Sequence, residues 1–128
     1  MKGKILLIFF IVMVCICGCK STGFLMAKAN VIMIGEPYPP KNNDAVIDVY
    51  ITNKPTVEYI EFAQIRCNDT NDEWNLNQIK AKAREIGADG ILITGKASIA
   101  SFGVPIGMGM YSYLNEEYGI NAVAIKYK

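Results

Sequence analysis

The sequence predicts a two-layer α+β domain in which one helix packs on a small mixed sheet of four strands. Three patterns lead to this prediction. Apolar and polar residues alternate over several short segments, apolar residues recur at three- and four-residue steps over one longer segment, and a short apolar run follows that segment closely. The resulting order is strand, strand, helix, strand, strand, which suits one helix against one sheet.

The first two strands are expected over residues 45–52 and 57–67. In the first, Ile47, Val49 and Ile51 point to one face, as in a strand with one buried side. A segment containing proline then interrupts the pattern. The alternation in the second strand is imperfect, which predicts a bulge, or burial on both faces for part of its length.

The helix is expected to begin near Thr70 and to end at Gly87. Thr70 and Glu73 have the spacing of a capping box, in which each side chain bonds the backbone amide of the other residue. One apolar stripe follows at helical spacing, made of Leu76, Ile79, Ala83 and Ile86. Gly87 stands where a helix commonly ends in the left-handed conformation.

Two further strands are expected at 91–94 and 121–127, and the stretch 102–113 between them is apolar, glycine-spaced and uncharged. One interpretation is a long connection that folds back over the bare face of the sheet. The other is an exposed contact site for a partner or for lipid. Under the second interpretation the candidate contact residues are Phe102, Ile106, Met108, Met110, Tyr111 and Tyr113.

The N-terminal residues resemble a bacterial lipoprotein signal. Two lysines precede the uncharged run 5–16, which is shorter than the roughly 20 residues of a membrane-spanning helix. Ile16-Cys17-Gly18-Cys19 then follows the lipobox order of apolar, small, Gly or Ala, and Cys. In this interpretation residues 1–18 are removed and Cys19 carries lipid. The alternatives are an ordinary secretion signal and an uncleaved anchor.

The lipobox also sets the expected domain organisation and location. Residues 19–44 would be the lipidated N-terminus and tether, with 31–34 either a strand or part of a docked tether, and 45–128 would be a single domain. In the Gram-negative lipoproteins that the signal resembles, an acidic residue after the acceptor often causes retention at the inner membrane. Lys20 therefore favours the outer membrane, facing the periplasm.

A second resemblance lies in residues 80–93, KAKAREIGADGILI. This run is similar to a segment of small bacterial envelope lipoproteins, among them the outer-membrane stress sensor of the Rcs phosphorelay and related domains labelled heavy-metal binding. The resemblance covers about 57–94 together with the lipobox. The chain departs from the Rcs sensor by lacking its disulfide cysteines, and from a metal-binding domain by lacking histidine and any cysteine pair.

Composition narrows the classes of function. Histidine is absent, which removes the commonest general base and the commonest zinc ligand. Without residues 1–18 the chain has 11 basic and 12 acidic side chains and no basic run, so nucleic acid is not an expected partner. Cys67 would be the only free cysteine, so no internal disulfide is expected. We expect no enzymatic activity and no cofactor.

The expected function is that of a membrane-anchored, non-enzymatic lipoprotein of the cell envelope. Palmitate or a related acyl chain on Cys19 would attach it to the membrane. It would bind another envelope protein in a sensing or accessory role. The alternatives are a small-ligand or metal-binding module, and a structural homo-oligomer paired through its sheet edges or through 102–113.

Overall fold

The computed structural model describes residues 26–128, without the side chain of Phe102. In chain order its elements are β1 (Asn30–Met33), β2 (Asp48–Tyr50), β3 (Tyr59–Cys67), α2 (Asp72–Glu85), β4 (Gly90–Gly95), β5 (Ser98–Gly107), β6 (Met110–Tyr118) and β7 (Ile120–Tyr127). Strands account for 47% of the described residues and helix for 14%. The described part of the chain is therefore mostly β.

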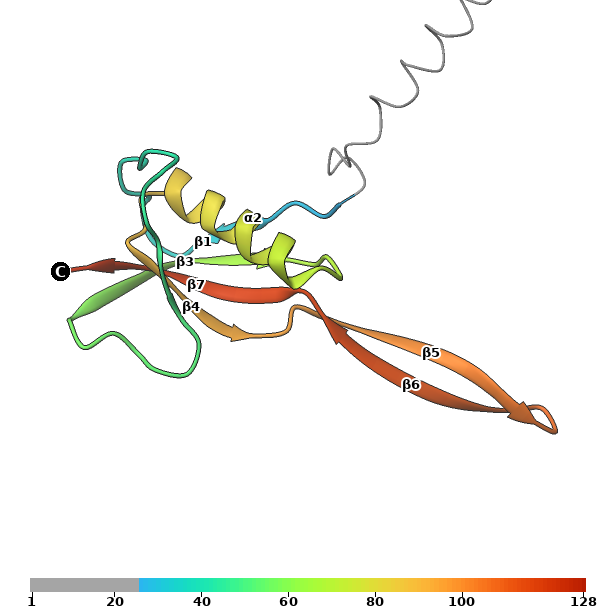
Figure 1. The fold of residues 1–128 in the computed structure, drawn as a ribbon. Helices are drawn as coiled ribbons and strands as arrows, with labels where there is room; N and C mark the ends of the chain where they lie inside the picture. Colours follow the sequence, from blue (N-terminus) through green and yellow to red (C-terminus); the bar gives the residue numbers. More distant parts are fainter. Residues whose placement is uncertain (1–25) are drawn as a thin grey trace, which may run out of the picture.

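Five strands form one sheet in the order β1-β3-β7-β4-β2, while β5 and β6 form a separate two-stranded sheet that projects from the domain (Figure 1). Only β2 and β4 pair in parallel; the other neighbours in the large sheet are antiparallel. The predicted fold of one helix on a four-stranded sheet is therefore wrong. The four strands left out β1, although a strand at 31–34 was one of the two alternatives for the segment assigned to the tether, and the β5–β6 hairpin was treated as a connection.

Helix α2 lies against one face of the five-stranded sheet (Figure 1). The predicted apolar stripe is confirmed: Ile79 and Ala83 are fully buried, and Leu76 and Ile86 pack against the same cluster from partly exposed positions. Small residues of the sheet face this helix, which lets it approach closely. They include Ala63, Ala122 and Ala124.

The helix begins one residue later than predicted. Asn71, not Thr70, is the N-cap, and its side-chain oxygen accepts a hydrogen bond from the Trp74 amide at 3.0 Å. The Asp69 carboxylate in turn accepts a hydrogen bond from the Asn71 amide, also at 3.0 Å. Thr and Asn both suit an N-cap, so the type of residue did not decide between them. The hydrogen bond from the Asn71 amide to Asp69 holds Asn71 in the N-cap position.

The end of the helix is as predicted. Gly87 has a φ of +78°, the left-handed conformation that favours glycine. A Cβ at Gly87 would also lie 2.5 Å from the carbonyl oxygen of Pro39. The proline-containing connector between β1 and β2, residues 34–47, therefore packs directly on the C-terminal end of α2.

The two strands that follow this connector, β2 and β3, match the expected pattern except at one residue. Ile47 is buried, but Ile51 is 75% exposed because β2 ends at Tyr50 and the chain leaves the sheet there. The prediction that both residues share a buried face is wrong at Ile51. The bulge expected in the following strand is confirmed and lies in β3 between Glu61 and Ala63.

The sheet face opposite α2 carries a smaller apolar cluster. Side chains alternate along a strand, so the neighbours of the α2-facing residues point to this second face. Leu92, Val123 and Ile125 form its centre, and the rings of Tyr50, Tyr59 and Tyr127 pack against them. This cluster covers one end of the open face and leaves the other end polar.

Candidate functional site

Strands β5 and β6 form a long hairpin closed by a two-residue turn. They pair from Ser98 opposite Tyr118 to Gly107 opposite Met110, with an irregularity between Pro105 and Gly107. The turn residues Met108 and Gly109 have φ values of 51° and 76°. Positive φ at both central positions is typical of the type I′ turn, whose twist matches that of the flanking strands.

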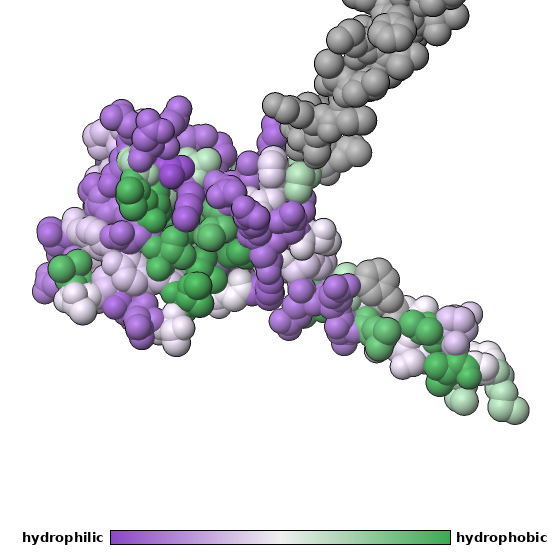
Figure 2. All heavy atoms as spheres, viewed as in Figure 1, coloured by the Kyte–Doolittle hydropathy of each residue, from purple (hydrophilic) through white to green (hydrophobic). Residues whose placement is uncertain are grey.

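Apolar side chains cover both faces of this hairpin and are exposed. By strand alternation Val104, Met110 and Leu114 lie on one face, and Ile99, Tyr111 and Tyr113 lie on the other. Between Lys96 and Glu116 the sequence contains no charged residue. Figure 2 shows hydrophobic side chains along the projecting hairpin, and a separate hydrophobic patch on the domain that is surrounded by hydrophilic residues.

The interpretation of 102–113 as a lid on the sheet is therefore wrong, because the segment projects away from the domain (Figure 1). Five of the six candidate contact residues have exposed side chains on the hairpin: Ile106, Met108, Met110, Tyr111 and Tyr113. The backbone of Phe102 pairs with Leu114 in the hairpin, and its side chain lies outside the described structure. Cys19, the expected lipidation site, also lies outside the described residues.

Sequence reasoning missed Ile99, Val104 and Leu114, which extend the same surface. The signal that identifies them is the turn: once Met108-Gly109 is recognised as a hairpin turn, the segments on both sides become paired strands. Gly103 then gains a role. It lies opposite Tyr113, and a Cβ there would lie 3.6 Å from the Tyr113 ring and 3.7 Å from the Tyr111 ring. The two tyrosine rings therefore pack over this glycine.

The base of the hairpin is held by the five-stranded sheet. The guanidinium of Arg66 in β3 donates hydrogen bonds to the carbonyl of Ala97 and, at 3.1 Å, to the Ser98 hydroxyl. Between β6 and β7, Gly119 has a φ of +75°, and a Cβ there would lie 2.6 Å from the carbonyl oxygen of Cys67. The hairpin thus leaves the domain at the end of β3.

The incoming N-terminal chain is held at the same end of the domain. The Ala27 amide donates to the Asp69 carboxylate at 2.9 Å, and the Ala27 carbonyl accepts from the Trp74 indole at 2.6 Å and from the Cys67 thiol at 3.6 Å. Hydrogen bonds from the amides of Asn71 and Ala27 lower the pKa of Asp69. Burial raises the pKa of Cys67, which favours an unreactive thiol. The N-terminal segment is therefore held at Ala27, beside the base of the hairpin.

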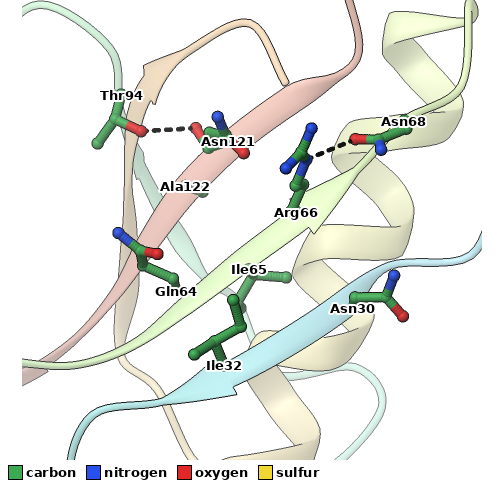
Figure 3. Close-up of a pocket in the computed structure, with 9 residues that line it drawn as sticks. All are labelled: Asn30, Ile32, Gln64, Ile65, Arg66, Asn68, Thr94, Asn121 and Ala122. Carbon is green, nitrogen blue, oxygen red and sulfur yellow. Dashed lines mark hydrogen bonds between the residues drawn. The ribbon is translucent and has the colours of Figure 1, made fainter. Parts of the chain in front are cut away.

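A shallow pocket of about 430 Å³ lies on the open sheet face (Figure 3). Its lining combines side-chain amides, one guanidinium and a few apolar groups: Asn30, Ile32, Gln64, Ile65, Arg66, Asn68, Thr94, Asn121 and Ala122. The lining contains no carboxylate, amine or thiol, and its one hydroxyl, that of Thr94, donates a hydrogen bond to the Asn121 carbonyl at 3.3 Å. Arg66 is already bound to Asn68 and to the hairpin base.

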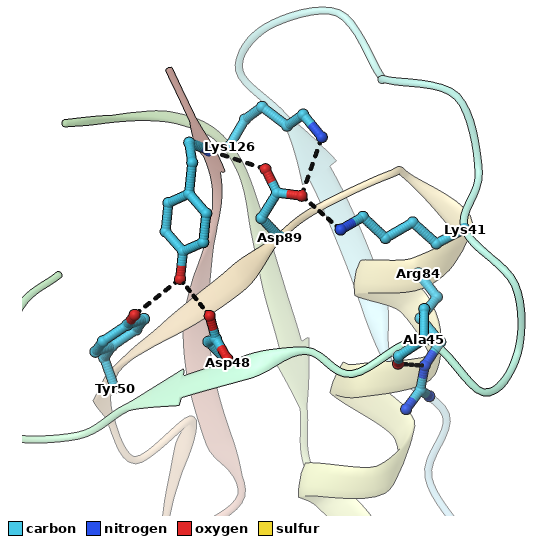
Figure 4. Close-up of polar contacts among 8 residues, drawn as sticks. Lys41, Ala45, Asp48, Tyr50, Arg84, Asp89 and Lys126 are labelled. Atoms are coloured by element: carbon cyan, nitrogen blue, oxygen red, sulfur yellow. Dashed lines mark hydrogen bonds and ion pairs between the residues drawn. The ribbon is translucent and has the colours of Figure 1, made fainter. Parts of the chain in front are cut away.

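A cluster of polar side chains around Asp89, separate from the pocket, fixes the connector before β2 to the sheet (Figure 4). The Asp89 carboxylate accepts hydrogen bonds from Lys41 at 2.5 Å, from Lys126 at 3.0 Å and from the Tyr127 amide at 2.9 Å. Nearby, the Tyr127 hydroxyl contacts Asp48 at 2.6 Å, which ties edge strand β2 to β7. Burial and the Asp48 carboxylate raise the pKa of Tyr127. These groups are used in mutual contacts, so we assign them a structural role.

Asp89 is expected to make stability depend on pH. Burial raises the pKa of its carboxyl, but the hydrogen bonds from Lys41 and Lys126 outweigh this, and the net pKa lies below the usual value. Ionised Asp89 therefore stabilises the fold above its unfolded pKa of about 4. We expect Asp89→Asn to lower the free energy of unfolding by about 1–2 kcal/mol at pH 7. The difference from the wild type should shrink as the pH falls below about 4 and vanish once the pH falls through the lower pKa of Asp89 in the folded protein.

Urea unfolding at several pH values tests this expectation. Glu85→Gln is a matched control, since Glu85 pairs with Lys82 on the exposed surface of α2 and such pairs contribute little. A destabilisation by Asp89→Asn that stays constant down to pH 2 would show that the charge of Asp89 is not the cause.

Within residues 26–128, no three His, Cys, Asp or Glu side chains come together as metal ligands. No helix in that range combines the length and hydropathy that crossing a bilayer requires. Comparison of the chain with protein-family models, curated proteins and solved structures found no match. The resemblance to the Rcs sensor and related lipoproteins therefore stays a prediction from the sequence.

Proposed function

We propose that this protein is a lipid-anchored, non-enzymatic lipoprotein of the bacterial cell envelope that binds another envelope protein through the β5–β6 hairpin. The observation that carries the proposal is the exposed hairpin with apolar side chains on both faces, whose only charged residues are Glu116 and Glu117 at its base. Strands with two apolar faces are suited to burial on both sides. A two-stranded hairpin is also marginally stable by itself in water, so a covering partner would stabilise it.

The part of the hairpin best suited to a protein partner is its shaft, which we define as residues 98–104 and 112–118. Within the described chain neither outer edge of the hairpin pairs with a further strand. On the β5 side the shaft contains Gly103 and ends just before Pro105, which has no amide to donate. Strand β6 contains neither proline nor glycine. It therefore offers an unbroken backbone edge to an added strand.

The proposed location rests on the lipobox. Lipid on Cys19 would hold the protein at the membrane, and Lys20 favours the outer membrane, facing the periplasm. The contacts of Ala27 with Asp69 and Trp74 support this arrangement, because they fix the domain end of a short tether. A partner would then be a protein of the same membrane or of the adjoining periplasm.

Photo-crosslinking in intact envelopes tests the proposal. A photo-reactive residue replaces Tyr113, which is exposed on the shaft, and the matched control carries the same residue at Lys54, exposed in the loop after β2. We expect one defined protein adduct from position 113 and none from position 54. An adduct with a second copy of this chain would favour the homo-oligomer instead. No protein adduct, or the same adducts from both positions, would contradict the proposal.

A further inference from the structure

Polarity changes in one direction along the hairpin. The base carries Glu116 and Glu117, and the next pair, Ser101 and Asn115, is joined by a side-chain hydrogen bond of 2.7 Å. Two tyrosines follow toward the turn, and the end is aliphatic. We define the tip as residues 105–111, and its most exposed aliphatic side chains are those of Ile106, Met108 and Met110.

The tip is apolar on every side rather than on one face. Met108 is 99% exposed at the end of the turn, and Ile106 and Met110 are about three-fifths exposed on either side of it, at 63% and 58%. A stable protein interface buries about 800 Å² on each partner and has a polar rim. A two-residue turn offers little area and no such rim. Insertion into a lipid surface requires neither a large contact area nor a polar rim.

Two tyrosines where the tip meets the shaft match the composition of a membrane–water boundary: Tyr111 is the last residue of the tip, and Tyr113 lies near the start of the shaft on β6. Tyrosine is enriched there because its ring is apolar and its hydroxyl remains hydrated. Tyr111 and Tyr113 lie on one face of the hairpin and are exposed. Farther back, the unpaired backbone edges cannot enter hydrocarbon without a large cost. The pattern therefore suits contact with the interfacial layer, about 5–10 Å deep, and not a crossing of the bilayer.

The position of the proposed anchor agrees with this arrangement. Figure 1 shows the incoming chain and the hairpin leaving the same end of the domain, with the C-terminus at the opposite end. Cys19 precedes Met26 by seven residues. Such a segment spans at most about 25 Å. A strand of ten residues such as β5 is about 33 Å long. The hairpin is therefore long enough to reach the surface that holds the lipid.

We infer that the hairpin tip is a second, non-covalent membrane contact that dips into the interfacial layer of the bilayer holding Cys19. This inference rests on the lipid anchor of the proposed function, but it concerns the tip and leaves the shaft to the protein partner. The anchor keeps the tip at high local concentration near the bilayer, so a contact of low intrinsic affinity suffices. Two attachments would also fix the orientation of the domain.

Depth measurement on the full lipidated protein tests this inference. The protein is reconstituted into vesicles of phosphatidylethanolamine and phosphatidylglycerol, and an environment-sensitive fluorophore is attached to Met108→Cys. Cys67 is fully buried, so the label goes to the introduced cysteine. We expect a blue-shifted emission and quenching by nitroxide lipids that is several-fold stronger than for the same label at Lys54→Cys. Adding Met108→Glu to a Met110→Cys reporter should remove most of the quenching.

The outcomes separate the inference from the proposed anchor. Vesicle flotation first reports whether the protein is attached through Cys19. A protein that floats with the vesicles while the label at position 108 stays in water and unquenched would overturn the inference and leave the anchor in place. A protein that does not float would overturn both. A photo-reactive residue at Met108 that captures a protein in envelopes, without lipid quenching, would assign the tip to a protein partner and also overturn the inference.

Discussion

Ile79→Ala is expected to lower the free energy of unfolding by about 2–5 kcal/mol, the range of large-to-small substitutions in well-packed cores. Ile79 is fully buried at the centre of the α2 stripe, against the small residues of the sheet. Truncation removes apolar contacts and leaves a cavity that the rigid sheet cannot fill. Since small domains are stable by about 5–15 kcal/mol, the loss is a large share of the total.

Chemical denaturation of the two proteins measures this effect. Ile51→Ala is the matched control: it removes the same atoms from a side chain that is 75% exposed, and it should change stability by less than about 0.5 kcal/mol. Equal and small shifts for both variants would mean that the helix does not pack on the sheet as described.

Cys19→Ser is expected to abolish acylation and to release the protein from the membrane fraction, or to leave it as an uncleaved precursor. Cys19 is the only cysteine of the N-terminal segment preceded by a small residue of the lipobox type, Gly18. A hydroxyl cannot replace the thiol as the lipid acceptor. Each buried methylene of an acyl chain contributes about 0.8 kcal/mol to membrane attachment, so loss of the chains should have an all-or-none effect.

Palmitate labelling and membrane fractionation report this outcome, and Cys17→Ser is the matched control. Serine is as small as cysteine, so the control should keep both the label and the membrane location. Label that persists in Cys19→Ser would show that the acceptor lies elsewhere. Loss of label from both variants would instead indicate a general failure of export.

The sequence predicted those parts of the fold in which local pattern and tertiary packing agree. The α2 stripe repeats at helical spacing, and Ile79 and Ala83 are buried as that spacing predicts. Gly87 ends the helix because a left-handed residue is required there. The bulge in β3 was visible as a break in alternation. Each of these features depends on a few neighbouring residues.

The hairpin could not be predicted in the same way, because its pattern is unusual. Most hairpins alternate apolar and polar residues, whereas β5 and β6 carry apolar residues on both faces, and the strong turn signals Asn-Gly and Asp-Gly are replaced by Met108-Gly109. Edge strand β1 was left as one of two alternatives for another reason. Four residues carry little periodicity, and their pairing with β3 is a long-range contact. The absence of charge nevertheless marked 102–113 as either a lid or an exposed contact site, and the exposure of five of the six candidate residues agrees with the second alternative.

The hairpin occupies a special position in the chain order. Strands β4 and β7 are neighbours in the sheet, and Gly95 lies opposite Asn121, so a tight turn would be enough to connect them. No residue of β5 or β6 belongs to either described core cluster. The β5–β6 hairpin is thus an insertion between β4 and β7, where the fold needs only a short connection. Mutations can therefore lengthen, shorten or change the side chains of the hairpin without repacking the core. The length of the hairpin and the surface that it contacts can evolve without loss of the fold.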